Sequence, residues 1–420
     1  MTLTITFVRH ARSEANVAQI WQGHGDSVLA PEGVEQAKAL ARRLETTHLD
    51  LVVTSDLART DATARAVSDD VVVDPAWREM DLGEWEGQSF EAVRAAHPDL
   101  LRAIREGEDI PFGGSGETFR DFEARVEESF RLLIERVGEG SVLVVTHGGV
   151  IDALVGSRLG RVRGRRTYPI VTNTSLTTFV VGDGRTAPER LQLTTFNDAA
   201  HLGHDAGFLG RVRGDGVPVA GFLRHGVTGA NKEHRIQGQT CWGLDDEGRL
   251  QATRFAEWYG PVDRVITSPL LRARQTAELV TNGRPATLDP RLQEMAFGEW
   301  EGLAFRELLD SGDELAHRVF REREDLPRGG SGESFRMLVD RLSGFLDDFR
   351  PEPTERTLVV SHGAAIRAVA AAIGEHDDMW SGLGTSPNTG VTHVAWTDEG
   401  PMIADYGVAP HLEAEGRRGS

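Results

Sequence analysis

The sequence contains very little cysteine and very little lysine. Cys241 is the single cysteine among 420 residues, so no internal disulfide can form and a thiolate metal site is excluded. Lys38 and Lys232 are the only lysines, which leaves arginine as the available binder of phosphate or carboxylate groups. A run of apolar residues long enough to cross a bilayer is also missing, as is a signal peptide, so we expect a cytoplasmic protein.

Positive charge is scarce overall. The formal net charge is −19 and the sequence pI is about 5.2, which disfavours nucleic acid and anionic membranes as partners. An anionic substrate must therefore be attracted by positive charge concentrated at one place. The length of 420 residues is enough for two or three domains, each burying its own core.

The most informative stretch is an apolar run that ends in adjacent arginine and histidine and is followed, six residues after the histidine, by asparagine. It occurs twice, as Arg9, His10 and Asn16 and as Arg224, His225 and Asn231. The offset is the same for both side chains, since 225 − 10 = 215 and 231 − 16 = 215. A period of about 215 residues indicates a domain duplication rather than a solenoid repeat.

Other features recur in the same order. A second arginine opens a helix, an acidic residue precedes a Gly-x-Trp-Glu-Gly turn, a Gly-Gly-Ser-Gly-Glu turn follows, and a second histidine comes after a later strand. The pairs are Arg59 and Arg272, Glu79 and Glu294, Gly113 to Glu117 and Gly329 to Glu333, and His147 and His362. Folding alone does not require all of these to be kept in both copies.

Strands alternate with helices in each copy, which predicts an α/β fold with a mostly parallel sheet covered on both faces. We expect strands near 2–9 and 141–146 and helices near 32–45, 89–106 and 117–137, with Ser55 or Asp56 capping the helix that carries Arg59. The predicted domains are residues 1–205 and 216–420, joined by a Gly-rich, charged linker at 206–215.

Two arginines and two histidines at one sheet edge would form a positive pocket suited to phosphate. A neutral imidazole there can attack phosphorus, the other three groups can stabilise the transition state, and Glu79 or Glu294 can protonate the leaving alkoxide. Taken singly, each residue is more simply explained as structural. A metal site is less favoured, because the histidines lack helical i, i+4 pairing.

These motifs resemble those of the histidine phosphatase superfamily, the cofactor-dependent phosphoglycerate mutase-like proteins, along nearly the whole chain, twice. The resemblance rests on Arg224-His225-Gly226, Ser268 to Ala277, Glu294 with Phe297 to Gly302, and Ser361-His362-Gly363. It implies two tandem three-layer α/β/α domains, a phosphohistidine intermediate and no metal or other cofactor. By the same resemblance His10 and His225 are nucleophiles and Glu79 and Glu294 proton donors, and phosphate is bound by Arg9, Asn16, Arg59, His147, Arg224, Asn231, Arg272 and His362.

The first copy departs from the family motif at Ala11, where the motif has glycine, and at Asp56, where it has proline. A positive φ at Ala11 would strain the backbone of the nucleophile. Both copies keep the core residues, so we expect a phosphomonoester phosphatase acting on a small metabolite, with a site in each copy. The alternatives are a phosphoglycerate-mutase-type phosphotransferase, one catalytic copy with a regulatory one, and a protein-phosphohistidine phosphatase. Phe112 and Arg328 differ at matching positions, which predicts different substrates for the two sites.

Overall fold

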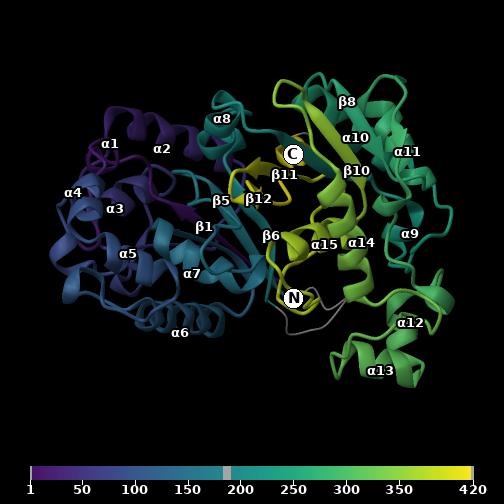
Figure 1. Cartoon of the computed structure of the whole chain (residues 1–420), viewed down its shortest axis with the longest axis horizontal. Coiled ribbons are helices and arrows are strands. Elements are labelled where there is room, and N and C mark those ends of the chain that lie inside the picture. The colour runs from purple at the N-terminus through teal and green to yellow at the C-terminus, as the bar shows by residue number, and fades with distance from the viewer. Residues whose placement is uncertain (1, 183–190, 418–420) are drawn as a thin grey trace. The chain divides into compact units, whose positions relative to one another are not determined.

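The chain folds into two compact units, seen in the computed structural model, which describes residues 2–182 and 191–417 (Figure 1). The first unit comprises Met1–Arg166, Ile170–Val181 and Asn197–Phe208, and the second comprises Thr167–Pro169, Gly182–Phe196 and Leu209–Ser420. Over the described residues, no helix is sufficiently long and apolar to cross a membrane.

Each copy forms a six-stranded sheet, and the two sheets have the same topology. The order is β3-β2-β4-β1-β5-β6 in the first and β12-β11-β7-β10-β8-β9 in the second, which is the same order read from the opposite edge. The strands are β1 (Leu3–Arg9), β2 (Leu51–Thr54), β3 (Val72–Val73), β4 (Gly140–Thr146), β5 (Leu176–Val181), β6 (Leu191–Asp198), β7 (Val219–Arg224), β8 (Arg264–Thr267), β9 (Thr287–Leu288), β10 (Thr357–Ser361), β11 (Val391–Thr397) and β12 (Gly400–Ile403).

The central strands are parallel and buried. β1 pairs with β4, β4 with β2 and β2 with β3, all parallel, whereas β5 pairs antiparallel with β1. In the second sheet β7, β10, β8 and β9 are parallel and β11 is antiparallel to β7. The expected α/β fold with a mostly parallel sheet in each copy is therefore confirmed.

Helices pack on both sides of each sheet. Figure 1 shows α2 and α3 on one side of β1 and α6 and α7 on the other, which is the layered arrangement expected from the sequence. The helices are α1 (Glu14–Val17), α2 (Pro31–Leu44), α3 (Ala58–Arg65), α4 (Phe90–Ala96), α5 (Pro98–Arg105), α6 (Phe119–Val137), α7 (Gly148–Leu159), α8 (Gly207–Gly214), α9 (Gly229–Lys232), α10 (Asp246–Tyr259), α11 (Leu271–Val280), α12 (Phe305–Asp310), α13 (Glu314–Phe320), α14 (Phe335–Asp348) and α15 (Gly363–Ile373).

Two local predictions are wrong. The helix expected over 89–106 is divided into α4 and α5 at His97, because Pro98 cannot continue the hydrogen bonding of the preceding helix and disfavours helical geometry at residue 97. Neither Ser55 nor Asp56 caps α3, whose N-cap is Leu57 without a side-chain hydrogen bond. Both side chains have other partners, described below.

The segment proposed as a linker contains helix α8, in which Leu209 and Val212 are buried. The proposed domain boundaries at 205 and 216 remain a proposal.

The two copies differ in the contacts made by the last turn of α2 and of its counterpart α10. In the first copy, Arg43 on α2 forms a buried ion pair with Asp198, with 2.5 Å between Nη2 and Oδ2. The matching position on α10 is Trp258, which stacks on His411 at 5.6 Å between ring centroids. Burial raises the pKa of Asp198, but the charge of Arg43 and the hydrogen bonds from Arg43 and Ala200 outweigh it and hold the pKa below its ordinary value.

We expect Asp198→Ala to destabilise the first unit by about 3–5 kcal/mol at pH 7, because it leaves the buried Arg43 without its counter-charge. Since the folded pKa of Asp198 is depressed, this contribution is present above about pH 4 and is lost as pH falls through the folded pKa. The free energies of unfolding of wild type and variant should therefore converge only as the pH falls below about 4, through the folded pKa of Asp198. Asp99→Ala, which removes an exposed ion pair with Arg102, is the control. Equal effects of the two substitutions at pH 7 would contradict the prediction.

Candidate active site

His10 lies directly after β1 and is buried, with 3% of its surface exposed. Its Nδ1 is 2.8 Å from the carbonyl oxygen of Ala11. A carbonyl only accepts hydrogen bonds, so in a neutral ring Nδ1 carries the proton and Nε2 carries the lone pair. Burial and then the charges of Arg59 and Arg9 hold the pKa of His10 well below its ordinary value. The imidazole is therefore neutral at physiological pH, with Nε2 free to act as a nucleophile.

His147 follows β4, the parallel neighbour of β1, so the two histidines meet at one edge of the sheet. Their ring centroids are 5.3 Å apart. Nε2 of His147 is 2.9 Å from Oγ of Ser55, which explains why Ser55 does not cap α3. Nδ1 of His147 is buried and has no hydrogen-bond partner among the described residues. Burial, then Arg59, His10 and Arg9, lower the pKa of His147 well below its ordinary value.

Two arginines frame these rings. Arg59, on α3, is 1% exposed and donates hydrogen bonds of 2.8 Å to the carbonyls of Gly23 and Gly25. Arg9 donates to the carbonyl of Val171 at 2.7 Å. These bonds fix both guanidinium groups while their Nε atoms remain buried without a partner. Burial lowers the pKa of Arg9 to about 10, so the group stays charged at neutral pH.

The second copy reproduces this arrangement. Nδ1 of His225 is 2.7 Å from the carbonyl of Gly226, and the rings of His225 and His362 are 5.2 Å apart. Nε2 of His362 is 2.8 Å from Oγ of Ser268. Burial, then Arg272 and other charges, hold the pKa of both histidines well below its ordinary value.

Arg272 gives direct evidence for the state of the His225 ring. Its Nε donates to Nε2 of His225 at 3.2 Å, so Nε2 is an acceptor and carries the lone pair. Its two terminal nitrogens donate to the carbonyls of Thr240 and Gly238 at 3.1 and 2.7 Å. Arg224 donates to the carbonyl of Ser386 at 2.6 Å.

Five buried nitrogens at the two candidate sites have no hydrogen-bond partner among the described residues. They are Nε of Arg9, Arg59 and Arg224 and Nδ1 of His147 and His362. Buried donors are costly when left unpaired, and charged ones more so, so these positions call for an acceptor that carries negative charge. A tetrahedral oxyanion bound beside His10 or His225 would give the arginine donors an acceptor that carries negative charge.

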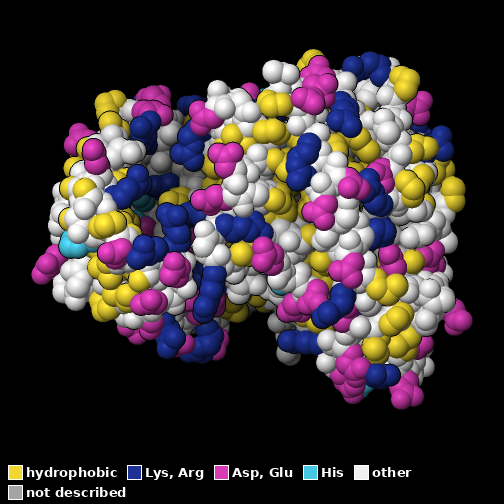
Figure 2. All heavy atoms as spheres, in the orientation of Figure 1, with side chains coloured by type: hydrophobic (Ala, Val, Ile, Leu, Met, Phe, Trp, Pro, Cys, Tyr) yellow, Lys and Arg dark blue, Asp and Glu magenta, His cyan; other side chains and the backbone are white. Residues whose placement is uncertain are grey.

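The positive charge of these sites is internal. Arg59 and Arg272 are 1% and 0% exposed, whereas Figure 2 shows acidic and basic side chains interspersed over the surface in view. This is the local concentration of positive charge that an acidic protein needs to attract an anion. Within the described part of the chain, no group of three or more His, Cys, Asp or Glu side chains is arranged to hold a metal ion.

Asn16 and Asn231 lie on α1 and α9, where each forms a capping box with Ser13 or Thr228. Asn173 connects Asn16 to His10, because its Nδ2 donates to the carbonyl of His10 at 2.7 Å and to Oδ1 of Asn16 at 3.4 Å. In the second copy Asn388 donates to the carbonyl of His225 at 2.9 Å. Asn173 and Asn388 recur at an offset of 215, and that repeat was the signal available in the sequence.

Glu79 and Glu294 are each held by the amide of the next residue and by amides at the start of the helix that follows the second histidine. The carboxylate of Glu79 accepts from Met80 and Gly149, each at 3.0 Å. That of Glu294 accepts from Met295 at 2.9 Å and from Ala364 and Ala365 at 3.3 and 3.2 Å. Gly149, Ala364 and Ala365 come two or three residues after the second histidine, so each carboxyl group is held at the start of the helix that follows that histidine.

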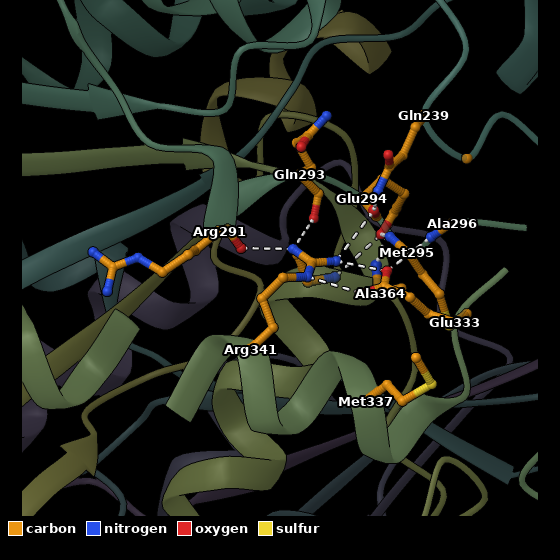
Figure 3. Close-up of polar contacts among 12 residues, drawn as sticks. Gln239, Arg291, Gln293, Glu294, Met295, Ala296, Glu333, Met337, Arg341 and Ala364 are labelled. Carbon is orange, nitrogen blue, oxygen red and sulfur yellow. Dashed lines mark hydrogen bonds and ion pairs between the residues drawn. The ribbon is translucent and has the colours of Figure 1, made fainter. Parts of the chain in front are cut away.

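Sequence reasoning missed the arginine that fixes each of these glutamates. Arg341 forms an ion pair of 2.7 Å with Glu333 and donates to the carbonyls of Arg291, Gln293 and Glu294 at 2.6, 2.9 and 3.4 Å. Figure 3 shows its guanidinium between Glu333 and the segment that carries Glu294. In the first copy Arg125 makes the corresponding contacts with Glu117 and with the carbonyls of Ala76, Arg78 and Glu79. Each arginine follows its Gly-Gly-Ser-Gly-Glu turn by eight residues, and this shared spacing could have indicated the pair.

The two departures of the first copy are accommodated. Ala11 is not among the residues with positive φ, and its amide donates to Oγ1 of Thr63 at 3.0 Å, as that of Gly226 does to Thr276 at 3.1 Å. The expected strain at Ala11 is therefore absent. Asp56 forms a two-point ion pair with Arg78, at 2.7 and 2.5 Å. The second copy has Pro269 and Gln293 at the matching positions, so a charge pair replaces a rigid turn.

A model of the histidine phosphatase superfamily, branch 1, matches residues 5–194 and again residues 221–409. A metal-independent phosphoserine phosphatase of Arabidopsis thaliana is 33% identical over 202 residues, which cover 46% of this chain and 83% of that protein. The adenosylcobalamin/alpha-ribazole phosphatase of Escherichia coli is 32% identical, covering 38% of this chain and 80% of that protein.

A probable phosphoglycerate mutase of Enterobacter is 31% identical, over 38% of this chain and 75% of that protein. A solved structure of a phosphoserine phosphatase variant from Entamoeba histolytica, in complex with phosphoserine, is 26% identical with a TM-score of 0.42, covering 46% of this chain and 98% of that one.

Proposed function

Since the chain belongs to the histidine phosphatase superfamily and is a phosphoric monoester hydrolase of that family, we propose that both of its copies hydrolyse small phosphorylated metabolites through a phosphohistidine intermediate. The observation that carries this proposal is the buried, neutral histidine in each copy, with its Nε2 lone pair set among cationic donors. The names of the relatives, which include phosphoserine and alpha-ribazole phosphatases, support a small phosphorylated metabolite as substrate.

In the first half of the proposed reaction, Nε2 of His10 or His225 attacks phosphorus and the bond from phosphorus to the leaving oxygen breaks. The two arginines and the second histidine donate hydrogen bonds to the non-bridging oxygens, which carry the developing charge. The protonated carboxyl group of Glu79 or Glu294 gives its proton to the leaving oxygen, so the alcohol departs neutral.

In the second half, water attacks the phosphohistidine and the nitrogen–phosphorus bond breaks. The carboxylate formed in the first half takes one proton from that water, which restores the starting state and releases inorganic phosphate. No group other than substrate and water is consumed, so atoms and protons balance over the cycle.

Matching contacts in the two copies support a site in each. Ala11 is the feature that favours a non-catalytic first copy, and its backbone has no positive φ that would strain His10, which supports a site there. The mutase alternative is favoured by the names of several relatives, and it differs in outcome because a mutase moves phosphate without net release.

The test is release of inorganic phosphate from phosphoserine, alpha-ribazole phosphate and phosphoglycerate, with and without EDTA. We expect release from at least one substrate at a rate that EDTA leaves unchanged. Isomerisation of phosphoglycerate without phosphate release would instead establish the mutase.

A further inference from the structure

The loop around His24 connects two parts of the first candidate site. The carbonyls of Gly23 and Gly25, on either side of His24, hold the guanidinium group of Arg59. Nε2 of His24 is 2.9 Å from the carbonyl oxygen of Glu79. A carbonyl only accepts hydrogen bonds, so Nε2 donates and carries the proton of the neutral ring. His24 therefore ties the loop that fixes Arg59 to the segment that carries Glu79.

The second copy makes the same connection with an amide side chain. The two carbonyls on either side of Gln239 hold Arg272, at 2.7 and 3.1 Å, and Nε2 of Gln239 donates to the carbonyl of Glu294 at 3.2 Å. Figure 3 shows Gln239 beside Glu294. The offset from His24 is that of the candidate nucleophiles, since 239 − 24 = 215. A neutral side chain is thus sufficient for the connection, and what the imidazole of His24 adds is the capacity to become charged.

His24 lies close to other charged groups of the first copy. Its ring is half-buried, and its amide donates to the carboxylate of Glu86 at 2.7 Å. The hydrogen bond from Arg78, and to a smaller extent the charge of His24, lower the pKa of Asp56. Burial, several nearer charges and then His24 lower the pKa of His147. The charged and titratable groups of the elements around His24 are Asp26, Asp56, Arg59, Arg78, Glu79, Glu86, Glu117, Arg125 and His147.

Four of the positions around this loop can carry charge in the first copy and are neutral residue types in the second. The first copy has His24, Asp26, Asp56 and Arg78, and the second has Gln239, Cys241, Pro269 and Gln293 at the matching positions. Asp56 is ion-paired with Arg78, and Asp26 accepts from the amide of Ala58, at the start of the helix that carries Arg59. Amides and proline are uncharged, and an ordinary cysteine thiol is neutral at pH 7.

The net charge of these positions depends on the state of His24. While His24 is neutral, the two carboxylates exceed the single positive charge of Arg78, so the first copy has one negative charge more than the second. Protonation of His24 removes that excess, and imidazole is the side chain that ordinarily changes charge between about pH 5 and 8. The neighbouring ion pairs of Arg125 and Arg341 occur in both copies and do not contribute to the difference. A phosphomonoester is an anion, so one more positive charge nearby favours its binding.

We infer that His24 is a positioning residue, which holds Glu79 and Arg59 in their relative places, and that its ionisation gives the first site a pH dependence that the second site lacks. The first site binds anionic substrates more tightly when His24 is protonated, whereas Gln239 maintains the same connection without titrating. The share of the activity that comes from the first copy therefore rises as the pH falls. The inference rests on the proposed function where it concerns turnover.

The experiment measures kcat/KM between about pH 5.5 and pH 8 in the His225→Ala protein, which retains the first site alone. The substrate is the phosphomonoester that this protein hydrolyses fastest, and the ionic strength is low, because Asp26 and Asp56 are exposed and salt screens their charges. At about pH 8, we expect His24→Gln to stay within about twofold of the parent protein and His24→Ala to lower kcat/KM by about tenfold, since only alanine loses the positioning contact. At about pH 5.5, we expect His24→Gln to fall about three- to tenfold below the parent, because it lacks one nearby positive charge.

His48→Gln is the matched control for the loss of a histidine, because His48 is 85% exposed at its side chain and pairs with Asp50. It should follow the parent protein at every pH. Two results would overturn the inference. One is a ratio of His24→Gln to parent that does not change with pH, and the other is an equal loss in His24→Gln and His24→Ala at about pH 8.

Binding of inorganic sulfate separates this result from failure of the proposed reaction. Sulfate is a tetrahedral dianion throughout this pH range, so its own charge does not change. Calorimetry on the His225→Ala protein should show that lowering the pH strengthens sulfate binding by about three- to tenfold more than it does after His24→Gln. If this difference is found but no phosphomonoester is hydrolysed, the inference about His24 stands and the proposed hydrolysis fails. If phosphate is released but neither measurement depends on His24, the inference is wrong and the hydrolysis stands.

Discussion

Replacing both His10 and His225 by alanine should lower phosphate release by a factor on the order of 10⁵, because loss of a nucleophile removes the covalent pathway altogether. Each single variant should retain the activity of the other copy, because each copy contains its own pair of histidines and its own pair of arginines. The ring centroids of the two histidines are 5.3 Å apart in the first copy and 5.2 Å apart in the second. The measurement is phosphate release over the substrate panel, with EDTA present.

His48→Ala is the matched control, because this histidine is exposed and pairs with Asp50 away from both sites. A double variant that releases phosphate as fast as wild type would contradict the phosphohistidine mechanism. If one single variant is already inactive on every substrate, the remaining copy is not a hydrolase of those substrates, and the regulatory alternative becomes the better account.

Replacing Glu294 by glutamine in the His10→Ala background should lower kcat/KM for alkyl phosphates by about 10²- to 10⁴-fold, the usual contribution of a general acid. The loss should be below about tenfold for p-nitrophenyl phosphate, because a nitrophenolate leaves without being protonated. Glutamine keeps the size of the side chain, and its single oxygen can still accept hydrogen bonds from Met295 and Ala365, which both bond Oε1 of Glu294. Glu79→Gln in the His225→Ala background should behave in the same way.

The control is Glu299→Gln, which removes an exposed carboxylate from the same loop and should change neither substrate. The comparison between leaving groups decides the role of Glu294. A loss of equal size for alkyl and nitrophenyl phosphates would mean that Glu294 supports the structure of the site and does not donate the proton.

The two copies show how one active-site design tolerates different surroundings. In both copies Nδ1 of the first histidine faces the carbonyl of the next residue, and Nε2 of the second histidine faces a serine hydroxyl. Around them, Asp56 and Arg78 replace a proline turn, and Arg43 with Asp198 replaces an aromatic stack. Residues that contact the reacting atoms have few alternatives, whereas packing and turn positions have several of similar free energy.

The sequence by itself determined the duplication, the α/β fold class and the pairing of the candidate residues between copies. The repeat at 215 residues, the strand-like run before each Arg-His pair and the later histidine are local patterns, and local patterns are readable from the chain. Helix α2 was likewise predicted to within a residue at each end, because its apolar spacing and Pro31 are local signals.

Only the tertiary structure decided which residues meet. The pairing of β1 with β4 brings together His10 and His147, which are 137 residues apart in the chain. The order of the strands depends on the packing of the whole unit and not on any one segment. Ser55 bonds to His147 and not to its own helix, and Arg341 reaches back to the segment of Glu294. These contacts were not predictable from the sequence, because the folded backbone determines which polar groups lie within hydrogen-bonding distance of each side chain.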